Sequence, residues 1–229
     1  GYTTRLVSDF IAHAKQEVGD FKIDYKGLFQ FIQNTNNSLA ASVNGLVDPN
    51  IFNLGNSLNQ PTASQSWGRT RTFGLTGMVD VAFKDYLFLA LTGRNDWVST
   101  LDPQNRSFFY PSAALSFVPT SAIEALKNVE AMDFLKFRTA WSKVGNVNMG
   151  AYGLVPGFSQ GAGFPYAGAG GFTISNLMIQ KGIRPEMTRS FEVGLESAWL
   201  KNRVTLDLTY YNNRTVDNIV STGVSWSTG

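Results

Sequence analysis

The chain has 229 residues, a formal net charge of +2 and no cysteine. The near-neutral charge gives no reason to expect nucleic acid as a partner, and the missing cysteines exclude disulfide frameworks and thiolate metal sites. No apolar run approaches the roughly 18 residues that a membrane helix needs, so bilayer-crossing helices are not expected.

The N-terminal part holds one clear strand between two segments without a clear pattern. Residues 1–19 have no clear pattern, and Arg5 to Gln16 fits either a short helix on a loop or a poorly patterned strand. From Asp20 to Ile32 apolar and polar residues alternate, which predicts a strand with one apolar and one polar face. Asn34 to Gly68 is rich in Asn, Ser, Gly and Pro, which predicts a loop. A loop of this length is unusual in a compact soluble domain.

Alternation resumes further along the chain. We expect strands from Arg69 to Phe83, Tyr86 to Trp97, Arg106 to Val118 and Asp133 to Lys143. A three-residue turn at 84–86 would keep the apolar positions of the first two strands on one side, by pairing Phe83 with Leu87.

One helix and a second long loop are expected in the remaining connections. Ser121 and Glu124 form a capping-box pattern, and apolar residues recur at helical spacing, which predicts a helix over 120–129. The segment from Gly145 to Arg184 is thick with glycine and aromatic residues and is expected to be a loop.

The segment from Lys181 to Val220 predicts a long hairpin. A two-residue turn at 201–202 sets Trp199 opposite Val204 and places the apolar positions of both arms on the same side. The same register sets Glu196 opposite Asp207, and directly opposed like charges are unfavourable. A water-filled interior with a nearby cation could tolerate this pair.

Strand length and loop placement favour a membrane barrel over a soluble β-sandwich. Each hairpin arm exceeds the five or six residues usual in soluble strands and suffices for the about nine to eleven residues that cross a membrane. With alternating strand directions, the long loops fall at one end and the short connections at the other. The expected fold is therefore all-β: an antiparallel transmembrane β-barrel segment of about seven strands, with long extracellular loops and one short helix at a periplasmic turn.

Four segments, in their order and spacing, resemble the SusC/RagA-like TonB-dependent outer-membrane transporters. They are Tyr86 to Leu101 (YLFLALTGRNDWVSTL), Asn105 to Val118 (NRSFFYPSAALSFV), Phe134 to Asn146 (FLKFRTAWSKVGN) and Arg184 to Val220. Singly, each segment is an ordinary strand. Residues 1–68 match only vaguely.

The resemblance implies a barrel of about 22 strands in the cell outer membrane. It implies that residues 1–229 belong to a single barrel domain, and that the plug domain and TonB box lie outside this chain. The expected function is import of oligosaccharides or peptides, with a SusD-like surface lipoprotein as a lid and energy from TonB acting through the plug. The expected partners are this lipoprotein, TonB, outer-membrane lipid and the substrate. No cofactor is expected.

Candidate ligand-binding residues lie near the outer ends of the strands. Arg94, Asn95, Asp96 and Trp97 form a dense polar and aromatic run, which could also be a salt bridge beside an interfacial tryptophan. On the long loop, aromatic residues suit contact with ligand or lid. These are Tyr152, Phe158 and Tyr166. Neither catalytic nor metal-binding residues are expected, because His13 is the only histidine.

Three other classes of protein remain open. A siderophore or cobalamin receptor of the same barrel type would use loop aromatics equally well. A non-transporting outer-membrane β-protein, such as an adhesin or a secretion component, would share the strands. A soluble β-sandwich would leave the membrane fraction without detergent.

Overall fold

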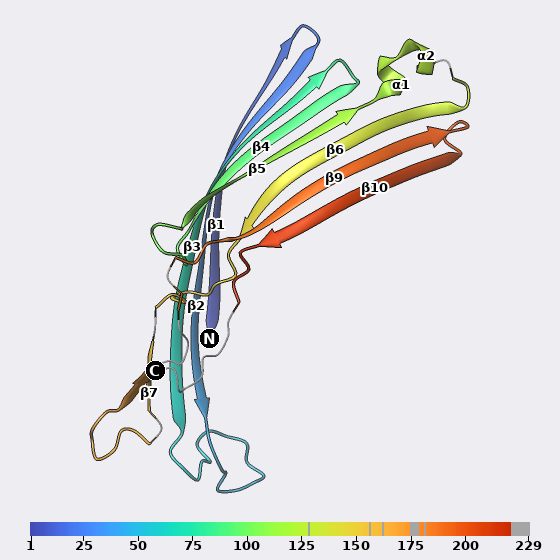
Figure 1. Ribbon diagram of the computed structural model, residues 1–229. Helices are drawn as coiled ribbons and strands as arrows, with labels where there is room; N and C mark the ends of the chain where they lie inside the picture. The colour runs from blue at the N-terminus through green and yellow to red at the C-terminus, as the bar shows by residue number, and fades with distance from the viewer. Residues whose placement is uncertain (128, 156, 162, 175–178, 181, 221–229) are drawn as a thin grey trace.

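Eight strands form one antiparallel sheet in which each strand lies beside its neighbour in the chain (Figure 1). The computed structural model describes all residues except 128, 156, 162, 175–178, 181 and 221–229. The order across the sheet is β1-β2-β3-β4-β5-β6-β9-β10. The bounds are β1 Tyr2–Val18, β2 Phe21–Ser42, β3 Thr62–Phe83, β4 Leu87–Val98, β5 Ser107–Phe117, β6 Met132–Asn146, β9 Glu186–Trp199 and β10 Val204–Val216.

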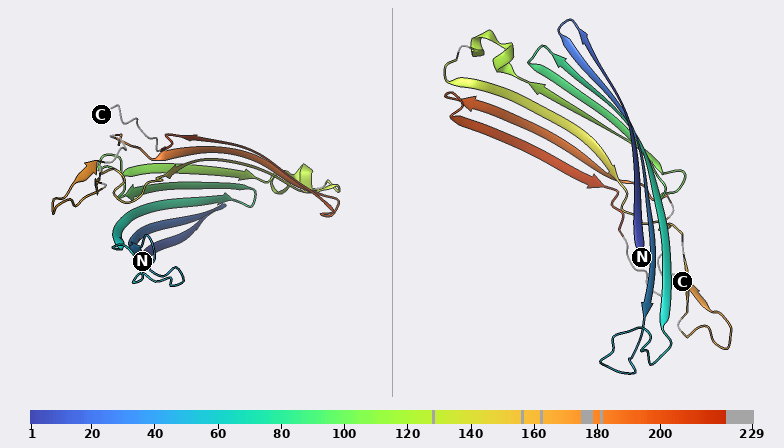
Figure 2. Two further views of the ribbon diagram at one scale, coloured as in Figure 1. Left: turned by 90° about the horizontal axis from the view of Figure 1, so that it is seen from below. Right: turned by 180° about the vertical axis from the view of Figure 1, so that it is seen from behind.

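The sheet is curved and open, with β1 and β10 at its two free edges (Figure 2). Tight turns at 19–20, 84–86 and 200–203 lie at one end, together with the compact helical β5–β6 link. Longer connections lie at the other end: 43–61, 99–106 and 147–185 (Figure 1). The predicted asymmetry of loops and turns is confirmed.

The unclear segment at 1–19 is a strand, so the sheet has eight strands rather than about seven. β1 pairs with β2 along its whole length, from Tyr2↔Asn37 to Val18↔Phe21. Its alternation is weak because serine, threonine and glutamine occupy some positions of the apolar parity. Pairing with β2, which is not visible in the local pattern, decides its structure.

The predicted loop at 34–68 is wrong at both ends, because β2 runs to Ser42 and β3 begins at Thr62. This outer part of the hairpin has water on both faces, so it shows no apolar alternation. Polar pairs join its arms instead: the hydroxyls of Ser38 and Ser66 are 2.7 Å apart, and those of Ser42 and Thr62 are 2.8 Å apart. Only residues 43–61 form the loop.

The second predicted loop, 145–184, lies almost where the structure has it, at 147–185, but it is not wholly irregular. β6 extends to Asn146 and β9 starts at Glu186. Between them, β7 (Phe158–Gln160) and β8 (Phe172–Ile174) form a separate two-stranded hairpin. Residues 156, 162, 175–178 and 181 of this prediction lie outside the described residues.

The predicted helix over 120–129 is two short helices, α1 (Pro119–Ala122) and α2 (Glu124–Lys127). Ile123 separates them with an extended backbone, at φ −109° and ψ 114°. The capping box is wrong, because Ser121 lies inside α1, while the N-cap is Val118 and has no side-chain cap. A proline at the first helical position starts α1 without the hydroxyl cap. Residue 128 lies outside the described residues.

The predicted registers are confirmed. Phe83 pairs with Leu87 across the turn at 84–86, and Trp199 pairs with Val204 across the turn at 200–203. Leu200, Lys201 and Asn202 all have positive φ, which gives this turn its left-handed backbone. Glu196 is opposite Asp207, as expected.

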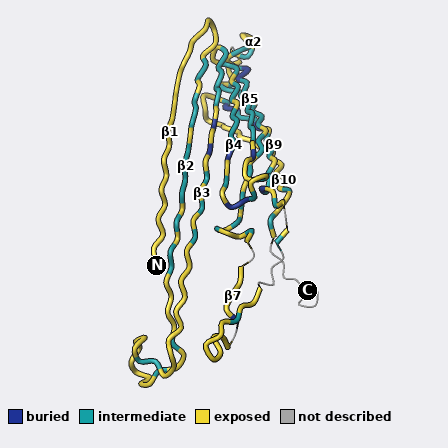
Figure 3. Tube along the Cα trace, turned by 90° about the vertical axis from the view of Figure 1, so that its left-hand side faces the viewer, coloured by how far each residue is buried: buried dark blue, intermediate teal, exposed yellow. Residues whose placement is uncertain are grey.

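Burial is inverted relative to a soluble protein. On β3, the apolar Leu75 is 53% exposed, while its polar neighbour Thr76 is 3% exposed. Figure 3 shows that most of the sheet surface is exposed or only partly buried. A soluble sheet would instead bury its apolar face against a second layer. No helix among the described residues is long and apolar enough to cross a membrane.

Candidate functional site at the extracellular end of the wall

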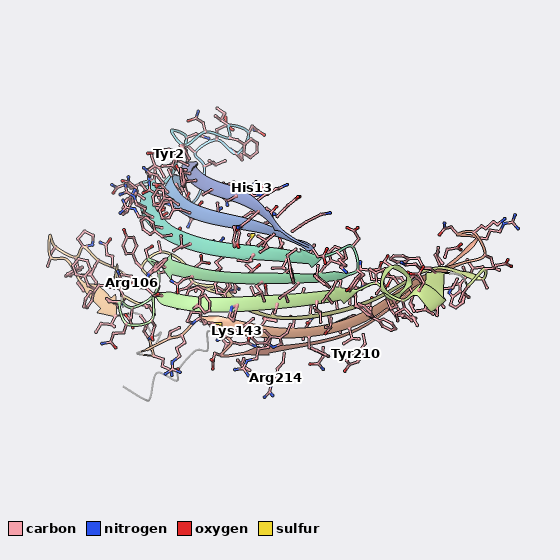
Figure 4. All side chains as sticks on the ribbon, turned by 90° about the horizontal axis from the view of Figure 1, so that it is seen from above. Tyr2, His13, Arg106, Lys143, Tyr210 and Arg214 are labelled. Carbon is pink, nitrogen blue, oxygen red and sulfur yellow. The ribbon has the colours of Figure 1, made fainter. Side chains whose placement is uncertain are left out.

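The register sorts side chains onto two faces of the sheet. One face carries most of the polar residues, and the other carries an apolar band from β1 to β10. Figure 4 shows His13 inside the curve of the sheet and Tyr210 and Arg214 outside it. Following membrane barrels, we name the inner face the lumen face and the apolar face the lipid face.

A network on the lumen face centres on Arg94 of β4. Its Nε donates to Asp96 Oδ1 at 2.9 Å and to the Tyr110 hydroxyl oxygen at 2.9 Å. Tyr110 in turn donates to the second carboxylate oxygen of Asp96. Because Asp96 is only 9% exposed, this ion pair is screened less than a surface pair. We name Gln30, Thr76, Arg94, Asp96 and Tyr110 the rim network.

The rim network crosses β3 over a glycine. Arg94 Nη2 donates to Gln30 Oε1 on β2 at 3.0 Å, and Nη1 lies 3.4 Å from Thr76 Oγ1. A Cβ on Gly74 would lie 2.7 Å from Asp96 Oδ1 and 2.9 Å from Arg94 Cζ. Gln30 then donates to Asp9 on β1 at 3.0 Å. The glycine therefore lets one arginine lie flat against the wall and connect four strands.

The structure separates the four predicted residues at 94–97. Arg94 and Asp96 lie on the lumen face, whereas Asn95 and Trp97 lie on the lipid face, because successive strand side chains alternate. Asn95 Nδ2 donates to Ser107 Oγ at 3.0 Å. Of these four residues, only Arg94 and Asp96 can contact a ligand in the lumen. The binding role of all four residues stays a prediction.

A second lumen-face network lies on β6, β9 and β10, and it contains the cation that the opposed carboxylates need. Arg138 Nη1 is 3.3 Å from Glu196 Oε1, and Nη2 is 2.9 Å from Asp207 Oδ1. Lys136 Nζ is 3.4 Å from Glu196, and Arg138 also donates to Thr209 at 2.5 Å. We name these five residues the inner bridge. Both Lys136 and Arg138 form ion pairs with Glu196, so this carboxylate has a structural role as an anion.

Residues 151–155 and the β4–β5 loop form a hollow against the outer part of β3. It has a volume of about 400 Å³, and its lining includes Trp67, Arg69, Thr100, Asp102 and Tyr152. The rings of Trp67 and Tyr152 are 6.1 Å apart, and the Arg69 guanidinium lies 5.0 Å above the Trp67 ring. Thr100 Oγ1 is buried without a hydrogen-bond partner among the described residues. We name this the rim hollow.

Of the three predicted loop aromatics, only Tyr152 belongs to the rim hollow. Phe158 and Tyr166 are 72% and 74% exposed on and beside the β7–β8 hairpin, which stands away from the main sheet in Figure 1. Their binding role stays a prediction. Sequence patterns did not single out Arg69, Thr100 or Asp102 as candidates, because a long loop brings them together and no local period marks them.

Charge clusters of other kinds are limited in the described part of the chain. No group of three or more histidine, aspartate or glutamate residues there could hold a metal ion. His13 Nε2 is 2.7 Å from Asp24 Oδ1, so the single histidine lies in an ion-pair position on β1 and β2. The site therefore offers hydrogen bonds, fixed charges and aromatic faces, which suit binding.

Comparison with solved structures gives matches to RagAB. The chain aligns with a chain of "Structure of the RagAB peptide transporter" at a TM-score of 0.83 and 17% identity, covering 99% of this chain and 25% of that one. It aligns with the RagAB peptide importer in the "closed-closed" state at a TM-score of 0.76 and 18% identity, covering 93% of this chain and 24% of the other. At these identities the likeness shows the fold alone.

Two curated relatives come from Formosa agariphila. TonB-dependent receptor P26 is 29% identical over 157 residues, which are 67% of this chain and 15% of the relative. TonB-dependent receptor P3 is 21% identical over 221 residues, which are 94% of this chain and 22% of the relative. The chain thus spans less than a quarter of the length of either relative.

A family model agrees with the inverted sheet and the asymmetric loops. The model described as TonB dependent receptor-like, beta-barrel matches residues 2–229. Since that match covers almost the whole chain, this chain belongs to the TonB-dependent receptor β-barrel family and is part of a barrel wall in the cell outer membrane.

Proposed function

We propose that this chain forms part of the wall of a SusC-type importer that takes up peptides or oligosaccharides across the outer membrane. The observation that carries the proposal is the likeness of 99% of the chain to a part of the RagAB peptide transporter. The barrel would be closed by strands outside residues 1–229. A plug domain and a TonB box, also outside this chain, would couple it to TonB.

The long extracellular connections support a lidded barrel. The β2–β3 hairpin and the β7–β8 hairpin project beyond the ends of β4 and β5 (Figure 1). Loops placed on a rigid scaffold are common sites of recognition. We propose that they meet a SusD-like surface lipoprotein, which would cover the barrel and deliver the substrate.

Trp67 and Arg69 share the parity of the lipid-facing Phe73, so the rim hollow would hold substrate at the outer surface of the barrel and not inside its lumen. Its groups support a polymer with both polar and flat apolar surfaces as substrate. Trp67 and Tyr152 offer aromatic faces on which a sugar ring or a peptide side chain can lie. The Asp102 carboxylate lines the same hollow and can accept hydrogen bonds from hydroxyl or amide groups. Peptides and oligosaccharides both combine these features.

The two lumen-face networks support passage through the barrel. In the rim network and the inner bridge, each arginine lies along the wall and is bound by carboxylates of the same wall. Charges that are already paired hold a passing substrate less tightly than free charges. A polar surface whose arginine and carboxylate charges are paired within the wall therefore suits transport.

The experiment that tests the proposal is a detergent pull-down of the full-length protein from native outer membranes, followed by mass spectrometry. A surface lipoprotein that co-purifies in a stable ratio supports the lidded importer. A barrel that arrives alone and binds a metal chelate indicates a siderophore or cobalamin receptor and overturns the substrate class. Adhesion or secretion components would overturn the transport function while leaving the fold intact.

Uptake of the substrate that the lipoprotein delivers tests the rim hollow. Tyr152→Ala should lower this uptake, because it removes one face of the aromatic pair. Tyr210→Ala on the lipid face is the matched control and should leave uptake unchanged. Equal uptake by wild type and Tyr152→Ala would exclude Tyr152 as a ligand contact.

A further inference from the structure

Three basic residues are direct neighbours across three strands on the lipid face. Arg189 of β9 is opposite Lys143 of β6 on one side and opposite Arg214 of β10 on the other. Their parity is that of Trp141, Phe191 and Tyr210, so they share the apolar face. Figure 4 shows Arg214 and Tyr210 projecting from the same side of the sheet. We name this row the cationic rung.

The charges of the cationic rung are not compensated by the described residues. None of the three has an ion pair or a side-chain hydrogen bond there, and Arg189 and Arg214 are exposed. Opposed side chains have Cβ atoms about 4.5–5.5 Å apart, and like charges at this separation destabilise a sheet. Along β6, β9 and β10, no lipid-facing position from Leu135 outward is acidic among the described residues.

The lumen face of the same strands shows how opposed like charges are normally handled. There, Glu196 and Asp207 are opposite each other, and Arg138 binds both. In the cationic rung the opposed charges are positive instead of negative. No described residue binds them as Arg138 binds Glu196 and Asp207. An anion from outside the chain would supply the missing partner.

The cationic rung lies at the outer boundary of the apolar band. Its nearest lipid-facing neighbours toward the membrane are Trp141, Phe191 and Asn212, and tryptophan is enriched at the membrane interface. From Val204 to Asn212 the strand rises about 27 Å, which a tilt of about 40° reduces to about 21 Å across the membrane. Arg214 lies two residues further out, so it reaches the edge of an apolar band about 25 Å tall.

A basic residue elsewhere on the same face gives a contrast. Arg71 of β3 is the next lipid-facing residue outward from Phe73, which pairs with Trp97. Its Nε, however, donates to Gln33 Oε1 on β2 at 2.8 Å. Arg71 is therefore satisfied within its own hairpin, whereas the cationic rung is not.

We propose that the cationic rung binds the phosphate groups of a phosphorylated glycolipid in the outer leaflet. Guanidinium groups form paired charge-assisted hydrogen bonds with phosphate oxygens, and lysine adds a point charge. Phosphates at the headgroup level would sit between neighbouring members of the rung and remove their mutual repulsion. The acyl chains would then lie along the apolar band below. This site depends on the membrane location and not on the proposed transport function.

Native mass spectrometry of the full-length protein with diphosphorylated lipid A tests the site. Each cation near a membrane surface contributes about a fivefold change in affinity, so Arg189→Gln with Arg214→Gln should weaken binding by about 25-fold. Lys201→Gln with Arg203→Gln, at the other end of the same hairpin, is the control and should bind as wild type does. Dephosphorylated lipid A should bind wild type and the rung variant equally.

A stability measurement separates lipid binding from a fold defect. In detergent without lipid, Arg189→Gln should raise the urea midpoint, because it removes repulsion from both neighbours. Diphosphorylated lipid A should raise the urea midpoint of wild type more than that of Arg189→Gln. Arg189→Lys, which keeps the positive charge, should show most of the wild-type increase. The proposal is overturned if the variant with both Arg189→Gln and Arg214→Gln binds diphosphorylated lipid A as tightly as wild type does. It is also overturned if inorganic phosphate at equal concentration displaces the lipid.

Discussion

Gly194 is the position at which a single methyl group should break the inner bridge. A Cβ built there would lie 2.8 Å from Arg138 Cγ and 3.1 Å from Arg138 Cδ, and it would overlap Arg138 Nε. These atoms belong to the middle of the side chain, so rotating the guanidinium alone cannot relieve the overlap. In Gly194→Ala the whole Arg138 side chain must leave the wall.

The magnitude follows from what Arg138 leaves behind. It binds Glu196, Asp207 and Thr209 from one guanidinium, and without it the two carboxylates stay opposed. Asp207 is largely exposed, so its pair with Arg138 is worth only about 0.2–1 kcal/mol. The half-buried Glu196 contact and the uncompensated carboxylates add to this, and we expect a loss of about 1–3 kcal/mol. Lys136 keeps its contact with Glu196 and limits the loss.

The sign of the effect should reverse when Arg138 is absent. Gly194 does not have positive φ, so alanine fits its backbone. In an Arg138→Ala background, Gly194→Ala should be neutral or stabilise by about 0.4–1 kcal/mol, through the lower entropy of the unfolded chain. Urea unfolding of the full-length barrel in detergent, followed by tryptophan fluorescence, measures all four proteins. If Gly194→Ala lowers the free energy of unfolding equally in the wild-type and Arg138→Ala backgrounds, the conclusion that Gly194 makes room for the Arg138 side chain is refuted.

Three further predictions follow from the faces and the networks. Leu206→Arg on the lipid face should lower the free energy of unfolding by about 2–4 kcal/mol if it faces the middle of the membrane. Thr205→Arg, its lumen-facing neighbour, should change it much less, and equal losses in the urea assay would contradict the assigned faces. Gly74→Ala should displace Arg94 and destabilise the outer end of β2 to β4, seen as faster hydrogen exchange there than in the β9–β10 hairpin. Trp67→Ala should weaken binding of the delivered substrate, measured by calorimetry, because the ring forms one side of the rim hollow.

The sequence predicts the membrane-spanning part of this fold well. In that part each strand has lipid on one face and water on the other, so apolar and polar residues must alternate and the alternation determines the register. The match of Phe83 with Leu87 and of Trp199 with Val204 follows from this rule alone. Outside the membrane, water wets both faces and the rule no longer applies. For this reason the sequence pattern predicts a loop for the outer parts of β2 and β3.

The candidate site is harder to predict because it depends on contacts between distant segments. Alternation does separate Arg94 and Asp96 from Asn95 and Trp97, so the sequence already contained the division of that run between two faces. In contrast, no local pattern brings Tyr152 to Trp67. That contact arises because residues 151–155 lie against the outer part of β3, and an irregular loop has no period from which this position could be predicted.

The two lumen-face networks share one construction, which follows from the thinness of the wall. A barrel wall is one strand thick, so a lumen-facing arginine can find partners only along the wall or in the water of the passage. To reach a partner along the wall, the arginine side chain must cross the neighbouring strand. The side chains of that strand occupy this space unless one of the residues is glycine. Gly74 leaves this space free for Arg94, and Gly194 leaves it free for Arg138. In both places a cation reaches the second strand away, to Gln30 and to Asp207. The glycines thus let charged residues bind strands together across the wall and leave the passage beside them free of long side chains.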